Sequence, residues 1–235
     1  MSIIATTLAA TTLGLAPSID DYVQSSLKDV SFTATVAKSS QTELKKINND
    51  FAAAYRFNKT SVMLKEPFKL RMEAKVEDMD ILFIVNGGTK AYKIPSRGLS
   101  KKENVSKAPG KRQTAFDFGM LTPALFNNYF SAKFVREDRR TGMTVFDVTY
   151  VSSLKDKTRH RIWVDDSKKF VSRREWYGQE GFLKATFEYS NPTQVGGVWV
   201  PTSLTVKNSE NKFSRRMSYT NFKVNSGLSE SLFSL

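Results

Sequence analysis

Along most of the chain, apolar and polar residues alternate one by one. Residues 68–77 show this pattern most clearly, because every second side chain is apolar and the side chains between are charged. Successive side chains of a β-strand point to opposite faces, so the pattern predicts a strand with one buried and one solvated face, as antiparallel sheets allow. The apolar set comprises Phe68, Leu70, Met72, Ala74 and Val76.

Further strand patterns occur between turn signals. Residues 81–85 form a continuous apolar run that ends in Asn86-Gly87-Gly88, which is typical of a tight hairpin, and residues 90–94 return. Phe51, Ala53, Tyr55 and Phe57 alternate in the same way and predict a further strand. Later strands are expected over residues 144–151, 159–164, 170–177, 182–189, 198–206, 213–219 and 222–224. About ten strands in meander order predict one strongly curved antiparallel sheet over residues 19–235, and thus a single mainly β domain.

Two segments interrupt this rhythm. Residues 97–113 are basic, contain glycine and proline and show no periodic pattern of apolar residues, so they predict an exposed loop. Residues 114–130 are rich in aromatics, and Leu121, Leu125, Phe126 and Tyr129 are spaced for one face of a helix. Thr122 and Pro123 suit its N-cap and first turn, and a short helical pattern also covers residues 19–27. The middle helix either fills the open side of the sheet or closes a ligand cavity there.

Few residues suit catalysis. The chain has no cysteine and a single histidine, His160, which excludes thiolate chemistry and any metal site with two imidazoles. Phosphate-loop, nucleophile-elbow and dinucleotide-binding motifs are absent from the sequence. His160 is expected on a solvated, basic strand face, while Glu175 and Glu180 flank a turn with nothing else that marks a glycosidase. We therefore expect no enzyme, no metal and no cofactor.

Positive charge is concentrated in three segments. The formal net charge is +13, and residues 97–112, 155–174 and 207–223 carry an excess of basic residues. Such clusters suit phosphate, either in nucleic acid or on anionic lipid, although a soluble basic protein has the same composition. Paired arginines beside aromatics, such as Arg173-Arg174 near Trp176, are compatible with single-stranded nucleic acid. The sequence has no RNA-recognition pattern, and the export signal described next also argues against nucleic acid.

The N-terminal segment predicts export. Residues 1–18 are uncharged and contain an apolar stretch of signal-peptide length, too short to cross a bilayer. Ala16-Pro17-Ser18 places small residues for cleavage before Ile19, although a basic n-region is missing. The alternative is a buried N-terminal helix. With a signal peptide over residues 1–18, the mature protein is periplasmic or otherwise extracytoplasmic.

Several short motifs, in order, resemble the LolA-like outer-membrane lipoprotein-sorting proteins. KEPFKLR at residues 65–71 is similar to that family's K-x-P-x-x-x-R strand, and VNGGTKAYKIP at residues 85–95 is similar to the hairpin that follows it. RIWVD and RRE at residues 161–165 and 173–175 resemble its later strands, as do GVWVP at 197–201 and YTNFKVN at 219–225 with Phe233 near the end. Each motif is weakly specific, and their shared order over residues 19–235 carries the resemblance.

The resemblance implies a non-enzymatic carrier. Its fold would be an incomplete β-barrel under a helical lid, with an apolar cavity for lipid or lipoprotein acyl chains. By position, the cavity wall would comprise Phe51, Ala53, Tyr55, Phe57, Leu70, Met72 and Ala74, and the lid Met120, Leu121, Leu125 and Phe126. The alternative is that these side chains fill a packed core. The family commonly has an arginine before the strand proline that ties down the lid, whereas this chain has Glu66.

Partners follow from the same resemblance and from the charge. We expect a carrier that moves acyl chains between membranes, docks on an anionic membrane surface and meets an inner-membrane transporter or an outer-membrane acceptor. The alternative function is a lipid-sensing regulatory module of an envelope-stress pathway. The expected docking surface comprises the 155–174 hairpins and the loop containing Arg97, Lys101, Lys102, Lys107, Lys111 and Arg112.

Overall fold

The computed structural model describes residues 16–235, and residues 1–15, which hold most of the predicted signal peptide, lie outside that range. The described chain forms a single 13-stranded antiparallel sheet that is curved and unclosed. Its strands are β1 (Asp29–Ser39), β2 (Lys59–Lys65), β3 (Lys69–Val76), β4 (Met79–Asn86), β5 (Thr89–Ile94), β6 (Leu99–Asn104), β7 (Phe130–Asp138), β8 (Met143–Tyr150), β9 (Arg159–Val164), β10 (Val171–Tyr177), β11 (Leu183–Val195), β12 (Val198–Asn208) and β13 (Phe213–Val224).

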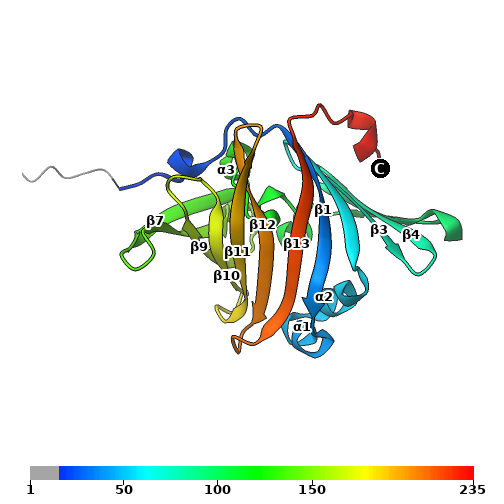
Figure 1. The fold of residues 1–235 in the computed structure, drawn as a ribbon, viewed down its shortest axis with the longest axis horizontal. Helices are drawn as coiled ribbons and strands as arrows, with labels where there is room; N and C mark the ends of the chain where they lie inside the picture. The colour runs from blue at the N-terminus through cyan, green and yellow to red at the C-terminus, as the bar shows by residue number, and fades with distance from the viewer. Residues whose placement is uncertain (1–15) are drawn as a thin grey trace, which may run out of the picture.

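The strand order places the two halves of the chain on either side of a central pair. The order across the sheet is β6-β5-β4-β3-β2-β1-β13-β12-β11-β10-β9-β8-β7, so the first and last strands pair in the middle. Figure 1 shows β1 and β13 side by side, with β3 and β4 on one flank and β7 to β10 on the other. Since β6 and β7 form opposite edges, residues 105–129 must cross the sheet. We call residues 105–129 the crossover segment, and the face that it covers the inner face.

The predicted alternation positions the inner face. In β3, Leu70 and Met72 lie opposite Leu64 and Val62 of β2 and opposite Val85 and Phe83 of β4. Leu70, Leu64, Val62 and Val85 are buried in one hydrophobic cluster, against which Met72 and Phe83 pack. The predicted strands at 68–77, 81–85 and 90–94 are thus confirmed, as is the mainly β, strongly curved sheet.

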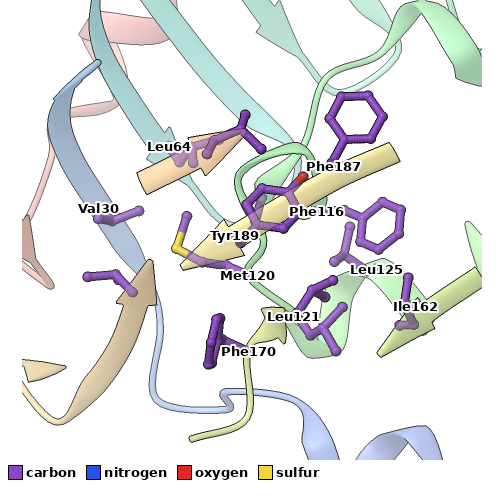
Figure 2. Packing of buried hydrophobic residues seen from close by; sticks show 14 of the residues in the cluster. Val30, Leu64, Phe116, Met120, Leu121, Leu125, Ile162, Phe170, Phe187 and Tyr189 are labelled. Carbon is purple, nitrogen blue, oxygen red and sulfur yellow. The ribbon is translucent and has the colours of Figure 1, made fainter. Parts of the chain in front are cut away.

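The crossover segment supplies the other side of this core. It contains 3₁₀ turns at Pro109–Lys111 and Ala115–Phe118 and one short helix, α3 (Pro123–Phe126), with Thr122 at its N-cap. Figure 2 shows Met120, Leu121 and Leu125 among Val30, Leu64, Ile162, Phe187 and Tyr189 of the sheet. α3 begins at Pro123, as predicted, but ends at Phe126 rather than near Tyr129, because Asn128 has a positive φ of 65° and β7 begins at Phe130. Residues 115–121 precede the helix and are held by the sheet, with Val171 N–H donating to the Gly119 carbonyl at 2.9 Å.

The predicted strand over residues 51–57 is wrong. These residues belong to α2 (Asn49–Ala53) and a 3₁₀ turn (Ala54–Arg56), which follow α1 (Gln41–Ile47). Ser40 and Asn48 cap the two helices, their side chains accepting from the backbone N–H groups of Glu43 and Phe51. Leu44, Ile47 and Phe51 also fit a helical period, and the caps favour the helix over the period-two pattern.

Residues 97–113, predicted as a loop, include a further strand. β6 pairs with β5 along its whole length and forms an exposed sheet edge. Its lysines are consistent with this position, since charged side chains protect an edge strand from further pairing. The expected exposure of Arg97, Lys101, Lys102, Lys107 and Lys111 is confirmed.

The C-terminal residues cover part of the outer face. A 3₁₀ turn (Glu230–Phe233) lies against β3 and β4, and Phe233 is fully buried. Arg71 Nη1 donates to the Leu232 carbonyl at 2.9 Å, and Asn86 Nδ2 donates to the Phe233 carbonyl at 3.2 Å. The C-terminal residues therefore bind the outer face of the β3–β4 hairpin through these two hydrogen bonds and the buried Phe233.

Candidate ligand-binding cavity

A cavity of about 290 Å³ lies between the crossover segment, α2 and the second half of the sheet. Strands β7 to β11 each contribute to its wall. The lining is aromatic on several sides and polar on others. It comprises Asn48, Asp50, Phe51, Gly110, Arg112, Gln113, Thr114, Phe116, Asp117, Phe130, Tyr150, Thr158, His160, Arg174, Trp176 and Phe187.

An ion pair joins two sides of the cavity. Arg174 of β10 is buried and its Nη1 donates to Asp117 Oδ1 at 3.0 Å. The other carboxylate oxygen accepts from the Thr114 backbone N–H at 2.9 Å, closing the first turn of the 115–118 segment. The guanidinium carbon lies 4.1 Å from the Phe187 ring centroid and 4.9 Å from that of Phe116. Burial lowers the pKa of Arg174, but Tyr189 and Asp117 outweigh it, so that its pKa is raised and Arg174 stays charged.

His160 also lines the cavity, and the expectation that it is solvated is wrong. It is 6% exposed and lies edge-on to Phe116, with ring centroids 5.3 Å apart. Burial, followed by the charges of Arg174 and Arg159, holds the pKa of His160 well below its usual range. The residue is therefore neutral. The alternation of side chains along β9 could have predicted this burial, since His160 lies on the same face of the strand as Ile162 and Val164, both fully buried.

Arg112 enters the cavity from the crossover segment. Its guanidinium carbon lies 4.4 Å from the Phe68 ring centroid and 4.7 Å from that of Tyr129. Within residues 16–235, no carboxylate lies at ion-pairing distance from Arg112. Burial lowers the pKa of Arg112. Arg112 was expected on the exposed docking loop, and the structure places it half-buried instead.

Most of the predicted wall and lid residues are packed rather than open to this cavity. Leu70, Met120, Leu121 and Leu125 are fully or almost fully buried in the core cluster, and Met72 and Phe126 pack against it. Ala74 and Phe57 are half-buried, Ala53 is exposed, and Tyr55 falls in the 3₁₀ turn after α2. Among these predicted residues whose side chains are described, Phe51 lines the cavity. Its ring stacks at 6.2 Å on Trp176 and lies 6.1 Å from Phe187.

Glu66, which precedes Pro67 in the turn between β2 and β3, contacts the helix of the crossover segment. Thr122 Oγ1 at the N-cap of α3 donates to Glu66 Oε1 at 3.0 Å. The second oxygen, Oε2, is buried and has no hydrogen-bond partner among the described residues. Burial raises the pKa of this carboxyl, partly offset by the bond from Thr122. A single side chain thus links the turn between β2 and β3 to α3.

The remaining acidic candidates have structural partners. Glu175 accepts from the Tyr177 hydroxyl at 2.6 Å and from Arg173 Nη2 at 2.7 Å, and Glu180 lies 3.9 Å from Lys184 Nζ. Asp165 caps its turn by accepting from the Ser167 and Lys168 backbone N–H groups. Over residues 16–235, the helices are all too short or too polar to span a bilayer.

Comparisons with known proteins agree with this architecture. A family model described as an uncharacterized protein matches residues 116–235, which is more than half of the chain. No curated protein matches the sequence. The solved structures that resemble it include a LolA superfamily protein from Nitrosomonas europaea, with a TM-score of 0.59 and 15% identity over 92% of this chain and 94% of that one.

Two further solved structures have the same fold. A DUF1329 family protein from Desulfovibrio piger has a TM-score of 0.57 and 12% identity over 92% of each chain. A putative outer membrane lipoprotein-sorting protein domain from Vibrio parahaemolyticus has a TM-score of 0.53 and 14% identity, again over 92% of each chain. The predicted resemblance in fold is confirmed.

Proposed function

We propose that this chain, which belongs to the family whose model matches residues 116–235 and has the fold of LolA superfamily proteins, is a non-enzymatic extracytoplasmic carrier. It binds an acyl chain within its sheet and transfers it between membranes. The observation that carries this proposal is the cavity between the crossover segment and the sheet, walled by Phe51, Phe116, Phe130, Trp176 and Phe187.

The physical problem of such a carrier is the exposure of hydrocarbon to water. Each methylene group moved from water into an apolar site gains about 0.8 kcal/mol, so shielding even part of one chain gives several kcal/mol. A hydrogen-bonded sheet suits this task, because its backbone groups are already paired and only side chains face the ligand. The cavity of about 290 Å³ is near the lower end of small-molecule pockets, and we therefore expect one chain rather than a whole diacylated lipid.

The packed residues of the crossover segment support the carrier role indirectly. Met120, Leu121 and Leu125 fix the crossover segment to the sheet (Figure 2). Phe126 packs against the same hydrophobic cluster. These residues form the base of a lid whose other end, residues 110–117, borders the cavity. A ligand larger than the cavity would enter by displacement of this second end, where the chain is held by polar contacts such as Asp117–Arg174.

The exposed basic residues supply a docking surface. Arg97, Lys101, Lys102 and Lys107 lie on or beside the edge strand β6, and Lys111 of the same region pairs with Glu103. Each basic residue near an anionic membrane surface contributes about 1 kcal/mol of attraction. We infer that this edge meets an anionic membrane, an inner-membrane transporter or an outer-membrane acceptor.

Quenching of tryptophan fluorescence by dibromostearate tests the carrier proposal, because bromine quenches only at close contact. Trp176 lines the cavity, whereas Trp199 packs near Lys168 and Gly197, away from it. Dibromostearate should quench the wild type, Trp176→Phe should remove most of the quenching, and the matched control Trp199→Phe should leave it. Quenching no greater than with unbrominated stearate in the wild type would contradict the proposal.

A further inference from the structure

The cavity contains buried polar atoms that the protein leaves unpaired. Among the described residues, Nδ1 of His160, Nε of Arg174, Nε of Arg112 and Oε1 of Gln113 have no hydrogen-bond partner. Buried polar groups are almost always paired, and each unpaired one costs free energy. All four belong to residues that line one cavity. The two guanidinium Nε–H groups are donors, Nδ1 of His160 can donate or accept, and Oε1 of Gln113 accepts, so a ligand with acceptor oxygens completes the bonding of the donors.

The charges of the lining show what kind of group that ligand presents. Arg174 is compensated by Asp117 at 3.0 Å, and that carboxylate is also engaged by the Thr114 N–H. Arg112 has no such acid, and the remaining acidic residue of the lining, Asp50, is exposed on α2. The half-buried wall thus has one uncompensated positive charge. A negatively charged group on the ligand would pair with Arg112 and offset the free-energy cost of burying its unpaired charge.

The cationic and imidazole groups contact one aromatic cluster. Arg112 lies over Tyr129, whose ring centroid is 5.5 Å from that of Tyr150 and 4.7 Å from that of Phe130. His160 lies 6.2 Å from Phe130 and 6.4 Å from Tyr150. Phe130 and Tyr150 of this cluster line the cavity, as do Phe51, Trp176 and Phe187. The Phe51 ring stacks on Trp176 and lies tilted to Phe187.

We propose that the cavity is an amphiphile site with a built anion-binding end, in which Arg112 pairs with the acidic group of an acyl-chain ligand and His160 donates or accepts one further hydrogen bond. The acyl chain lies against Phe51, Trp176 and Phe187. This inference rests on the proposed carrier function and specifies its ligand class, a single-chain acid whose head is a carboxylate or a phosphate monoester. A guanidinium suits both heads, since its N–H groups match their oxygens.

Binding of matched ligands to the full-length wild type tests the inference. Palmitate and hexadecyl phosphate carry the acid, hexadecanol carries the same chain without it, and inorganic phosphate carries the acid without the chain. We expect either acid to bind about tenfold or more tightly than hexadecanol, as charge-assisted hydrogen bonds give. The tighter of the two acids identifies the head group, and inorganic phosphate alone should not displace it at equal concentration.

The variant Arg112→Gln should bring the affinity of both acids down to that of hexadecanol, whereas the control Arg97→Gln, which removes an exposed arginine, should not. Equal binding of palmitate, hexadecyl phosphate and hexadecanol to the wild type overturns the anion-binding end but leaves the carrier proposal intact. Binding of none of the three overturns the carrier proposal as well. The wild-type comparison decides the question even where Arg112→Gln does not fold.

Discussion

Arg174 Nη1 donates to Asp117 Oδ1 at 3.0 Å, and this bond joins β10 to the crossover segment across the inner face. Besides this bond, the backbone N–H of Val171 at the start of β10 donates to the Gly119 carbonyl of the crossover segment. Arg174 is buried, whereas the Asp117 side chain is about one-third exposed. Asp117 therefore neutralises the buried charge of Arg174, and the ion pair and the Val171–Gly119 bond together hold this part of the crossover segment against the sheet.

Substitution Asp117→Asn should destabilise the fold. Removal of one partner leaves a buried charge uncompensated, which costs about 3–5 kcal/mol in fully buried pairs, and partial exposure of Asp117 reduces this to about 2–3 kcal/mol. Urea denaturation measures the change, with Asp78→Asn in an exposed turn as the control. The double variant Asp117→Asn/Arg174→Met should lose less than the sum of its single variants, and additive losses would show that the two residues do not interact.

Glu66→Gln should stabilise the protein at neutral pH by roughly 1 kcal/mol. The pKa of Glu66 is raised in the folded state, so folding takes up a proton and the charged form weakens the fold. The Glu66 carboxyl contributes most to stability at pH values below its pKa in the unfolded state. That contribution is lost as the pH rises through its pKa in the folded state. The glutamine still accepts from Thr122 and does not titrate, so the advantage should vanish in acid.

Denaturation of wild type and Glu66→Gln at neutral and acid pH measures this difference. Glu77→Gln is the matched control, since Glu77 is exposed. A stability difference between wild type and Glu66→Gln that does not change with pH would refute the assignment.

Phe233→Ala should cost about 3–5 kcal/mol, as truncation of a buried aromatic side chain generally does. Phe233 is fully buried on the outer face of the β3–β4 hairpin, whereas the next residue, Ser234, is exposed. Thermal and urea unfolding measure the loss, and Ser234→Ala should stay within about 0.5 kcal/mol of wild type. Equal stability of the two variants would mean that the C-terminal residues do not support the sheet.

Charge reversal at the β6 edge should weaken binding to anionic vesicles. At about 1 kcal/mol per residue, reversal of four lysines lowers the partition coefficient by well over tenfold. The measurement is cosedimentation with phosphatidylglycerol-containing vesicles. The test variant changes Lys101, Lys102, Lys107 and Lys111 to Glu, and a control with the same net charge changes Lys45, Lys59, Lys75 and Lys133, all exposed. Wild-type binding by the test variant would exclude this docking surface.

Strand alternation predicts the sheet where one face is clearly wet. β3 follows from its sequence because charged and apolar side chains alternate, and β4 and β5 follow because the apolar run at residues 81–85 ends in the hairpin signal Asn86-Gly87-Gly88. β1 is not predicted, since Thr33, Ala34 and Thr35 weaken the contrast, although Val30 and Phe32 are buried. α2 is mispredicted because Asn48, whose capping bond decides its start, has no weight in a hydrophobic pattern.

The cavity is less predictable than the sheet. Its polar end joins Arg112, Asp117, His160 and Arg174, and Asp117 and Arg174 alone are 57 positions apart. The pairing of distant strands brings these residues together, and the order of residues in the sequence does not show it. Charged side chains in a sequence also normally indicate a solvent-exposed position, so a buried arginine is not expected. The resemblance in motif order predicted the fold and a lid near Met120 and Leu121, yet in the structure these two side chains are packed core.

The most direct test of the carrier account is native mass spectrometry of the purified protein, paired with lipid extraction and uptake of a fluorescent fatty acid. The account predicts a single-chain acidic lipid bound to each molecule, or stoichiometric uptake of the fluorescent acid after delipidation. A protein that carries no lipid and takes up no fatty acid would contradict it.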